Sequence, residues 1–188
     1  MRNTLGPRRP PLAKIGDSKM RLETDRLLLR ALLPEDVEPE VALWSDPEVM
    51  RFMGGPRNNE RVRAILEGEL AEPPTGPLGQ WPVVDKATGE FVGDCGLIAK
   101  EIEGRDEVEL VYVLTTSAWG KGYATEIGAA LLRFAVEKLH QVRVVSLIDV
   151  DNVASKRVSG KLGMHREALV TRPDGTEREL WAIEVAGA

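Results

Sequence analysis

The feature of this sequence that most constrains its fold is a strand-like run that passes through a glycine-rich loop directly into an amphipathic helix. In the run EVELVYVL, residues 107–114, alternate side chains fall on opposite faces, as in a β-strand. Gly120 and Gly122 then allow the backbone to approach a ligand closely, and a helix beginning near Ala124 leaves its first N–H groups unpaired. Such a helix start binds anions. The unit therefore predicts a site for a ligand that carries phosphates.

Two known phosphate-binding motifs do not fit this loop. A dinucleotide fingerprint needs a third glycine where this chain has Thr125, together with an early βαβ unit. A P-loop needs Gly-Lys-Ser/Thr after four intervening residues, whereas Gly122 is followed by Tyr-Ala. A Gly-x-Gly pattern alone is also weak evidence, because many such loops are only tight turns.

The remaining periodicities predict an α/β protein with a mixed, mostly antiparallel sheet of six to seven strands and about four helices. The expected strands lie at residues 21–31, 81–84, 90–98, 107–114 and 142–148, with a last hairpin turning at 173–175. The expected helices lie at residues 34–44, 58–71 and 124–139, with a short one between 152 and 163.

Length and composition predict one globular domain at residues 20–188 of this 188-residue chain, because 43% of the residues are hydrophobic. Residues 1–19, rich in proline, glycine and basic residues, are expected to form a flexible N-terminal arm. A net charge of -5 argues against a nucleic-acid partner. No apolar run is long enough to span a membrane, and the lone Cys95 is expected to be a buried, inert thiol. We therefore expect a cytoplasmic protein.

No metal site is predicted. His140 and His165 each lack a second ligand at metal-binding spacing, so a structural role is favoured for both.

From Leu22 to about Val185 the chain resembles the GNAT superfamily, and within it the branch that resembles ribosomal-protein-alanine N-acetyltransferases. The order and spacing of several segments are more specific than any one of them: residues 23–27 (ETDRL), 92–97 (VGDCGL), 109–124, 152–157 (NVASKR) and 161–164 (KLGM). The resemblance implies a GNAT fold with a V-shaped split at the central strand, which opens after about Leu114. It also implies acetyl-CoA as the co-substrate.

The resemblance also implies how acetyl-CoA lies. Its pantetheine arm would pair with the exposed backbone of Tyr112, Val113 and Leu114 like an added strand. Its pyrophosphate would bind the N–H groups of the loop, formed by Trp119, Gly120, Lys121, Gly122, Tyr123 and Ala124. Trp119 stands where the general loop pattern has Arg or Gln, as is common in this branch, which indicates reliance on backbone contacts. The Tyr123 side chain either stacks on the cofactor or packs into the core.

Acyl transfer requires a neutral amine, so a carboxylate that removes its proton is expected in the cleft. Glu109 is the candidate base, because it lies on the cleft face of the strand and matches an acidic position in this branch. The alternative is that Glu109 is a solvated residue or a structural ion-pair partner. By homology, a backbone N–H at Val113 or Leu114 would donate to the oxyanion.

Asn152 and Ser155 lie one helical turn apart and can therefore face the same cleft. The resemblance implies that Asn152 binds the cofactor arm and Ser155 supports the leaving sulfur. A structural interpretation also stays open, in which Asn152 only caps the helix and Ser155 belongs to its first turn.

The predicted activity is acetyl transfer from acetyl-CoA to a primary amine, on a small molecule or a protein or peptide N-terminus, in a ternary complex. Residues around 48–63 and the hairpin at 173 would form the acceptor surface, and they do not identify the acceptor. A non-catalytic acyl-CoA-binding module and a nucleotide-binding protein are the alternatives. A homodimer is compatible with the sequence.

Overall fold

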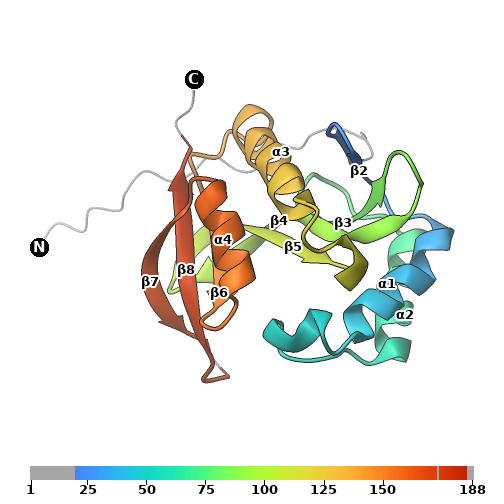
Figure 1. Cartoon of the computed structure of the whole chain (residues 1–188), viewed down its shortest axis with the longest axis horizontal. Coiled ribbons are helices and arrows are strands. Elements are labelled where there is room, and N and C mark those ends of the chain that lie inside the picture. The colour runs from blue at the N-terminus through green and yellow to red at the C-terminus, as the bar shows by residue number, and fades with distance from the viewer. Residues whose placement is uncertain (1–19, 173, 186–188) are drawn as a thin grey trace, which may run out of the picture.

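The computed structural model describes residues 20–172 and 174–185 (Figure 1). The expected arm at residues 1–19 lies outside this range. The described part contains eight strands in one sheet, with the order β1-β2-β3-β4-β5-β6-β8-β7. All neighbouring strands run antiparallel except β5 and β6, which are parallel. The predicted mixed, mostly antiparallel α/β fold is therefore confirmed.

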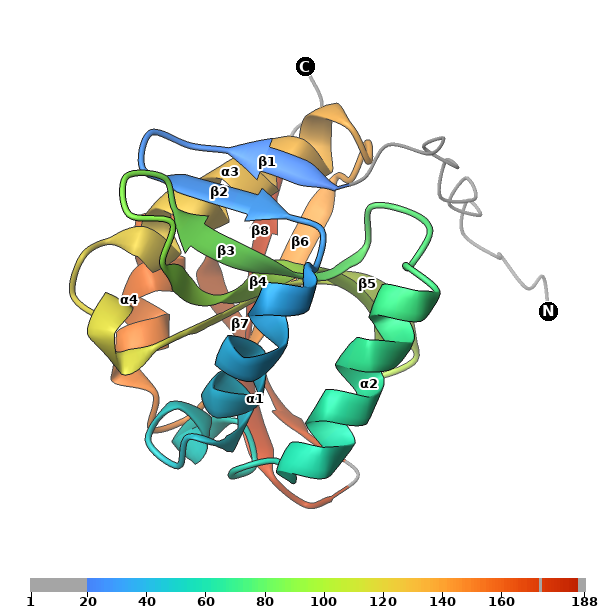
Figure 2. The same ribbon diagram turned by 90° about the vertical axis from the view of Figure 1, so that its right-hand side faces the viewer.

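The strands are β1 (Arg21–Glu23), β2 (Leu27–Arg30), β3 (Gly79–Asp85), β4 (Phe91–Ile102), β5 (Arg105–Leu114), β6 (Arg143–Asp149), β7 (His165–Thr171) and β8 (Glu177–Glu184). The α-helices are α1 (Val37–Ser45), α2 (Asn59–Ala71), α3 (Tyr123–Glu137) and α4 (Val153–Lys161). Short 3₁₀ helices are η1 (Pro34–Asp36), η2 (Val49–Phe52) and η3 (Thr116–Ala118). Figure 2 shows α1 and α2 on one side of the sheet and α3 and α4 on the other.

The sheet has one strand more than the expected six to seven, because the run at residues 21–31 is a hairpin and not one strand. The chain turns at residues 24–26, where Thr24 N donates to the Leu27 carbonyl at 2.9 Å. The Thr24 hydroxyl accepts from Leu27 N at 2.9 Å. A threonine side chain that bonds local backbone in this way stabilises a turn in place of a strand ladder.

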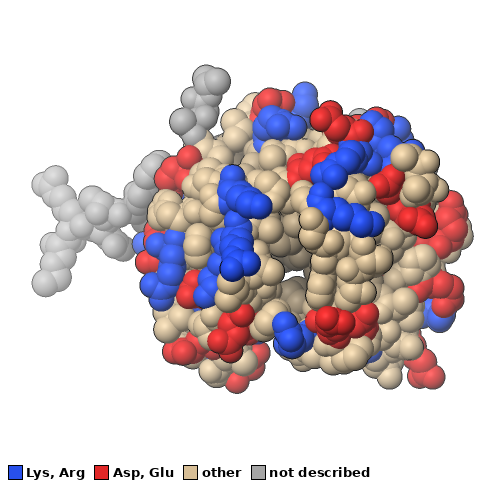
Figure 3. Space-filling model, viewed as in Figure 1, with Lys and Arg blue, Asp and Glu red and all other residues tan. Residues whose placement is uncertain are grey.

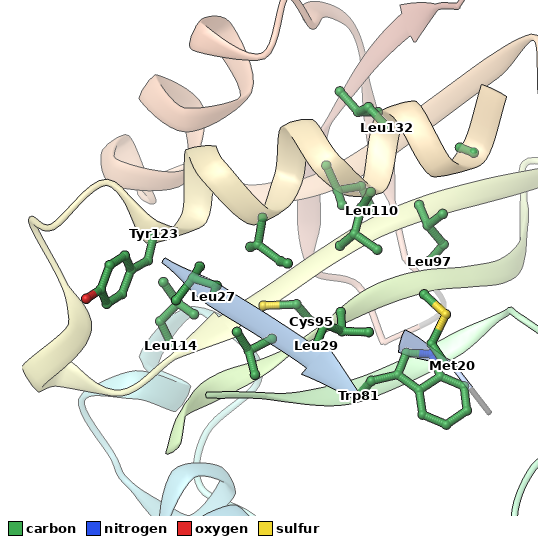
Figure 4. Packing of buried hydrophobic residues seen from close by; sticks show 14 of the residues in the cluster. Met20, Leu27, Leu29, Trp81, Cys95, Leu97, Leu110, Leu114, Tyr123 and Leu132 are labelled. Carbon is green, nitrogen blue, oxygen red and sulfur yellow. The ribbon is translucent and has the colours of Figure 1, made fainter. Parts of the chain in front are cut away.

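The main core lies between the sheet and α3. Ile127 and Leu131 on α3 are fully buried and belong to one apolar cluster with Leu110, Leu97 and Cys95 of the two central strands. Figure 4 shows Leu110, Leu97 and Cys95 between the strands and this helix. The expected buried position of Cys95 is confirmed, and burial raises the pKa of its thiol well above the usual value. The core therefore fixes β4, β5 and α3 relative to one another, and with them the loop that joins β5 to α3.

The predicted split of the sheet lies between β5 and β6, but it opens earlier than expected. Glu109 and Val145 form the one registered pair between these two fully described strands. Beyond it, side chains replace the backbone ladder: Ser146 Oγ donates to the Leu110 carbonyl at 2.9 Å, and Leu147 N donates to the Glu109 carboxylate at 3.1 Å. The expected opening after Leu114 is therefore wrong, because these two side chains already end the strand pairing at Leu110, earlier along β5.

A pair of buried carboxyl groups lies between α1 and β4. Glu40 is 1% exposed and Asp94 is 7% exposed. The Trp44 indole donates to Glu40 at 3.0 Å, while Asp94 Oδ1 has no hydrogen-bond partner among the described residues. Burial raises the pKa of both carboxyl groups, and the negative charge of Asp94 raises that of Glu40 further, while Glu69 raises that of Asp94. The folded protein therefore keeps protons here that the unfolded chain loses.

This pair predicts a pH-dependent stability. Because the folded-state pKa values exceed the unfolded values of about 4, stability is highest at low pH and falls as pH rises toward the raised folded values. We expect the free energy of unfolding to fall by roughly 2 kcal/mol more per pH unit in the natural protein than in Glu40→Gln/Asp94→Asn between pH 6 and 8, because each of the two retained protons contributes about 1.4 kcal/mol per pH unit. Urea unfolding at pH 6, 7 and 8 measures this difference. Parallel pH profiles for the two proteins would contradict it.

Candidate functional site

The opening between β5 and β6 forms a cleft of about 610 Å³. Residues of β5, the following loop, the start of α3, β6, the start of α4 and the segment around η2 line it. Figure 3 shows the surface hollowed near the centre of the view, with Lys and Arg side chains over α4 on one side of the hollow. The inner edge of β5 from Val111 to Leu114 therefore faces a cavity instead of a neighbouring strand.

The glycine-rich loop ends this cleft. Gly120 has a φ of 75° and Gly122 a φ of 82°, and the second of them is the N-cap of α3. Both angles lie in the left-handed region, which glycine adopts without a steric penalty. A Cβ atom at Gly120 would meet nothing within 4 Å, so the space before the loop is open. The first backbone bond of the helix is Glu126 N to the Gly122 carbonyl, and the preceding N–H groups therefore lack a partner within the helix.

A clamp from the first hairpin holds this loop in place. Arg26 donates to the Lys121 carbonyl at 3.0 Å and to Glu126 Oε2 at 2.7 Å. Thr24 Oγ1 and the backbone N of Arg26 donate to Glu126 Oε1 at 2.5 and 2.9 Å. Burial raises the pKa of Glu126, but these hydrogen bonds outweigh burial and leave the pKa lowered, so the carboxylate is charged. Sequence reasoning missed this clamp; the only signal was the resemblance of residues 23–27 to the family.

The Tyr123 side chain packs into the core, which decides between the two alternatives for it. It is 7% exposed, lies among the apolar residues of Figure 4, and donates from its hydroxyl to Asp85 Oδ2 at 2.6 Å. The hydrogen bond from Tyr123 lowers the pKa of Asp85. The Arg26 guanidinium lies 4.7 Å from the ring centre, within range of a cation–π interaction.

Trp119 contacts the end of β5. Its indole N–H donates to the Leu114 carbonyl at 2.9 Å, and the side chain is 44% exposed at the cleft. The indole thus occupies one lone pair of a carbonyl on the strand edge. Ala124 lines the cleft on the helix side of the loop.

Glu109 lines the cleft and is 5% exposed. Its Oε2 lies 2.6 Å from Lys100 Nζ, and its Oε1 accepts from Leu147 N. The carboxylate thus lines the cleft and is also an ion-pair partner. Lys100 was missed in the sequence, although it lies two residues after Ile98, which registers opposite Glu109, and therefore on the same face.

Tyr112 and Ser155 meet across the cleft. The two hydroxyl oxygens are 2.8 Å apart, and the Tyr112 hydroxyl also donates to the Ser155 carbonyl at 3.2 Å. Burial raises the pKa of Tyr112, so the phenol keeps its proton at neutral pH. Asn152 caps α4 by accepting from Ser155 N at 3.0 Å, and both residues line the cleft. The side-chain role of Tyr112 was not visible in the sequence, because β5 and α4 meet only in the folded chain.

Among the described residues, no group of three or more His, Cys, Asp and Glu side chains could hold a metal ion. Within the same ranges, no helix is long and apolar enough to cross a membrane.

Comparison with known proteins gives consistent results. A family model described as Acetyltransferase (GNAT) domain matches residues 26–165. The uncharacterized protein YkkB of Bacillus subtilis is 33% identical over 157 residues, which are 83% of this chain and 91% of that protein. The uncharacterized N-acetyltransferase p20 of Bacillus licheniformis is 28% identical over 156 residues, covering 79% of this chain and 84% of that protein.

Solved structures share the fold. RimL, a ribosomal L7/L12 alpha-N-protein acetyltransferase crystallised with coenzyme A, superposes with a TM-score of 0.72 at 18% identity. The match covers 90% of this chain and 100% of that one.

The match to the family model, the identity with YkkB and the GNAT fold agree with one another. This chain therefore belongs to the GNAT acetyltransferase family, and the prediction of an acetyl-CoA-dependent N-acetyltransferase is confirmed.

Proposed function

We propose that the chain transfers the acetyl group of acetyl-CoA to a primary amine by direct attack in a ternary complex. The observation that supports this most is the unpaired inner edge of β5, which leads directly into the open glycine-rich loop. An edge of this kind pairs with amide groups of an extended ligand, and a helix start binds phosphates. The pantetheine arm of acetyl-CoA has amides, and its diphosphate follows at the far end of the arm.

In this arrangement the main chain of Tyr112, Val113 and Leu114 pairs with the pantetheine amides. The N–H groups of the loop, from Trp119 through Gly120, Lys121, Gly122 and Tyr123 to Ala124, hold the diphosphate. The clamp formed by Thr24, Arg26 and Glu126 supports this proposal, because it fixes the loop before the ligand arrives. A preformed loop loses less conformational freedom on binding and therefore binds more tightly.

Glu109 is the proposed base. It lies at the origin of the split, where one carboxylate oxygen contacts Lys100 Nζ and the other accepts from Leu147 N. Each carboxylate oxygen offers about two acceptor positions, so an amine or a bridging water can be bound without loss of the bond from Leu147 N. Removal of one proton leaves the amine nitrogen with a lone pair that attacks the thioester carbon.

The tetrahedral intermediate carries its negative charge on the former carbonyl oxygen, where the N–H of Val113 or Leu114 would donate. Collapse of the intermediate breaks the carbon–sulfur bond, the attacking nitrogen loses its second proton to give the neutral amide, and the thiolate that leaves needs a proton. Tyr112 and Ser155 form a hydroxyl pair at the cleft, and the buried Tyr112 phenol is protonated. We assign proton donation to this pair, with Ser155 next to the sulfur, while Asn152 holds the pantetheine arm.

A direct assay tests the function. The protein is incubated with acetyl-CoA and a panel of primary amines, and release of free thiol is followed together with the mass of the acceptor. Acetylated product with stoichiometric CoA supports the proposal. Tight CoA binding with no release for any amine would favour a non-catalytic acyl-CoA-binding module, and tighter binding of ATP than of CoA would favour a nucleotide-binding protein.

Gly120→Asn tests the phosphate site. Gly120 and Gly104 share a φ of 75° and open space at the Cβ position, but Gly104 lies in the turn between β4 and β5, outside the cleft. The conformational free energy of placing asparagine at a positive φ is therefore similar in the two variants. We expect Gly120→Asn to weaken CoA binding by at least about tenfold, which corresponds to one lost charge-assisted hydrogen bond. Gly104→Asn should bind CoA normally in calorimetry, and equal affinities for the two would refute the site.

Glu109→Gln tests the base. We expect kcat to fall on the order of a hundredfold or more, the usual contribution of a general base, with little change in CoA affinity. Glu107→Gln is the matched control, because Glu107 is also 5% exposed on the same face of β5 but pairs with Arg143 and does not line the cleft. Steady-state kinetics measures both variants. If Glu109→Gln retains the kcat of Glu107→Gln, Glu109 has no part in proton removal.

Tyr112→Phe and Ser155→Ala test the leaving-group assignment through a double-mutant cycle. Because the two hydroxyls lie 2.8 Å apart and are proposed to act as one unit, each single variant should lower kcat roughly tenfold. The double variant should be little worse than either one. Single-turnover rates at saturating acetyl-CoA measure the effect. Fully additive losses would show that the two hydroxyls act independently.

A further inference from the structure

The charges that line the cleft are predominantly basic, although the whole chain has a net charge of -5. Figure 3 shows Lys and Arg side chains over α4 and, beside acidic side chains, at the lower margin of the hollow. The basic residues that line the cleft are Arg51, Arg57, Lys100, Arg157, Lys161, Arg172 and Arg178, and the acidic ones are Glu48, Glu109 and Asp149. A cleft with one predominant sign of charge selects ligands of the opposite sign.

Two of the three acids are already neutralised. Glu109 pairs with Lys100 at 2.6 Å, and Asp149 pairs with Arg178 at 2.7 Å. Glu48 is thus the one acid of the lining without an ion pair among the described residues. The cleft consequently offers a cationic amine few uncompensated negative charges.

Arg51 and Arg57 belong to the segment around η2, which is expected to form part of the acceptor surface. Arg51 lies in η2, Arg57 follows it, and both side chains are exposed. Neither has an ion-pair partner within the described ranges. The Arg51 guanidinium lies 4.5 Å from the ring centre of Phe52, and Arg57 Nη2 donates to the Met53 carbonyl at 3.4 Å. Both therefore keep most of their donors free for a ligand.

The segment that bears these arginines is anchored to the reacting strand. Met50 is fully buried and packs with Leu43 and with Val113 of β5. Arg57 N donates to the Trp44 carbonyl at 2.8 Å, and Gly55 N donates to the Met50 carbonyl at 3.0 Å. The two guanidinium groups are thus attached to a backbone that is fixed relative to Val113, one of the proposed oxyanion donors.

Arg172 lines the same cleft from the end of β7, but its charge is partly compensated. Asp174, in the turn of the hairpin, has its pKa lowered by hydrogen bonds from Thr176, and the positive charge of Arg172 lowers it further. Arg51 and Arg57 are therefore the better candidates for binding an anion.

We propose that the acceptor is an amine that also bears an anionic group, and that Arg51 and Arg57 bind this group while the amine reaches the thioester. The proposal rests on the acetyltransferase function proposed above. Arginine donates in a fork that matches carboxylate and phosphate oxygens, so either anion fits the same two residues. A diamine or polyamine would instead place a second positive charge beside two unpaired guanidinium groups.

Three amines of matched length test the proposal: 4-aminobutyrate, butylamine and 1,4-diaminobutane, with 3-aminopropyl phosphate to separate carboxylate from phosphate. We expect kcat/KM for one of the anionic amines to exceed that for 1,4-diaminobutane by about tenfold or more. Arg51→Gln/Arg57→Gln should remove this preference by raising KM much more for the anionic amines than for butylamine. Arg133→Gln, an exposed position on α3 outside the cleft, is the control for the loss of charge.

Calorimetric binding of the same amines to the protein–CoA complex separates this proposal from the proposed function. If anionic amines bind through Arg51 and Arg57 but are not acetylated, the proposed anion site is supported and the proposed acetyl transfer is contradicted. Acetylation that favours butylamine or the diamine would preserve the transfer and overturn the anion site. Failure of both anionic amines to bind or react would also overturn it, as would an equal loss for all amines in the double arginine variant.

Discussion

The separation of β5 from β6 is the constraint on which the rest of this structure depends. Two side chains produce it: Ser146 donates to the Leu110 carbonyl, and Glu109 accepts from Leu147 N, so the ladder ends after one registered pair. Each strand is kept in place by its outer neighbour, β5 by β4 and β6 by β8. An unpaired strand edge normally attracts another strand, and here the loop, α4 and the η2 segment enclose it. The opening is therefore a feature of the fold and not a flexible gap.

The glycine-rich loop at the end of that opening is held by contacts from the N-terminal hairpin. The turn at Thr24 and Arg26 binds Glu126 in the first turn of α3, and Arg26 also binds the Lys121 carbonyl. Tyr123 is held from the side by Asp85. The glycines leave the loop backbone open to a ligand, while these contacts restrict its movement. The N–H groups can consequently point at one fixed place, which is what recognition of a diphosphate by main chain requires.

The periodicity of residues 107–114 and the following glycines predicted the central strand, the loop and α3, because these features depend on local conformation alone. The fold class followed from the order of such elements. The turn at Thr24 was missed, because one side-chain hydrogen bond outweighs an apolar strand pattern. The ion pair of Glu109 with Lys100 and the bond between Tyr112 and Ser155 depend on register and on the packing of α4, which local sequence patterns do not specify.

Glu109 links this architecture to the proposed chemistry, because one carboxylate ends the strand pairing and also faces the cleft. As a base it would alternate between charged and neutral forms, and the neutral form is a weaker acceptor for Leu147 N. Lys100 provides a second attachment, because its ammonium lies 2.6 Å from the other oxygen of the same carboxylate. Lys100 therefore helps to keep the proposed base in position and to preserve the geometry of the split between turnovers.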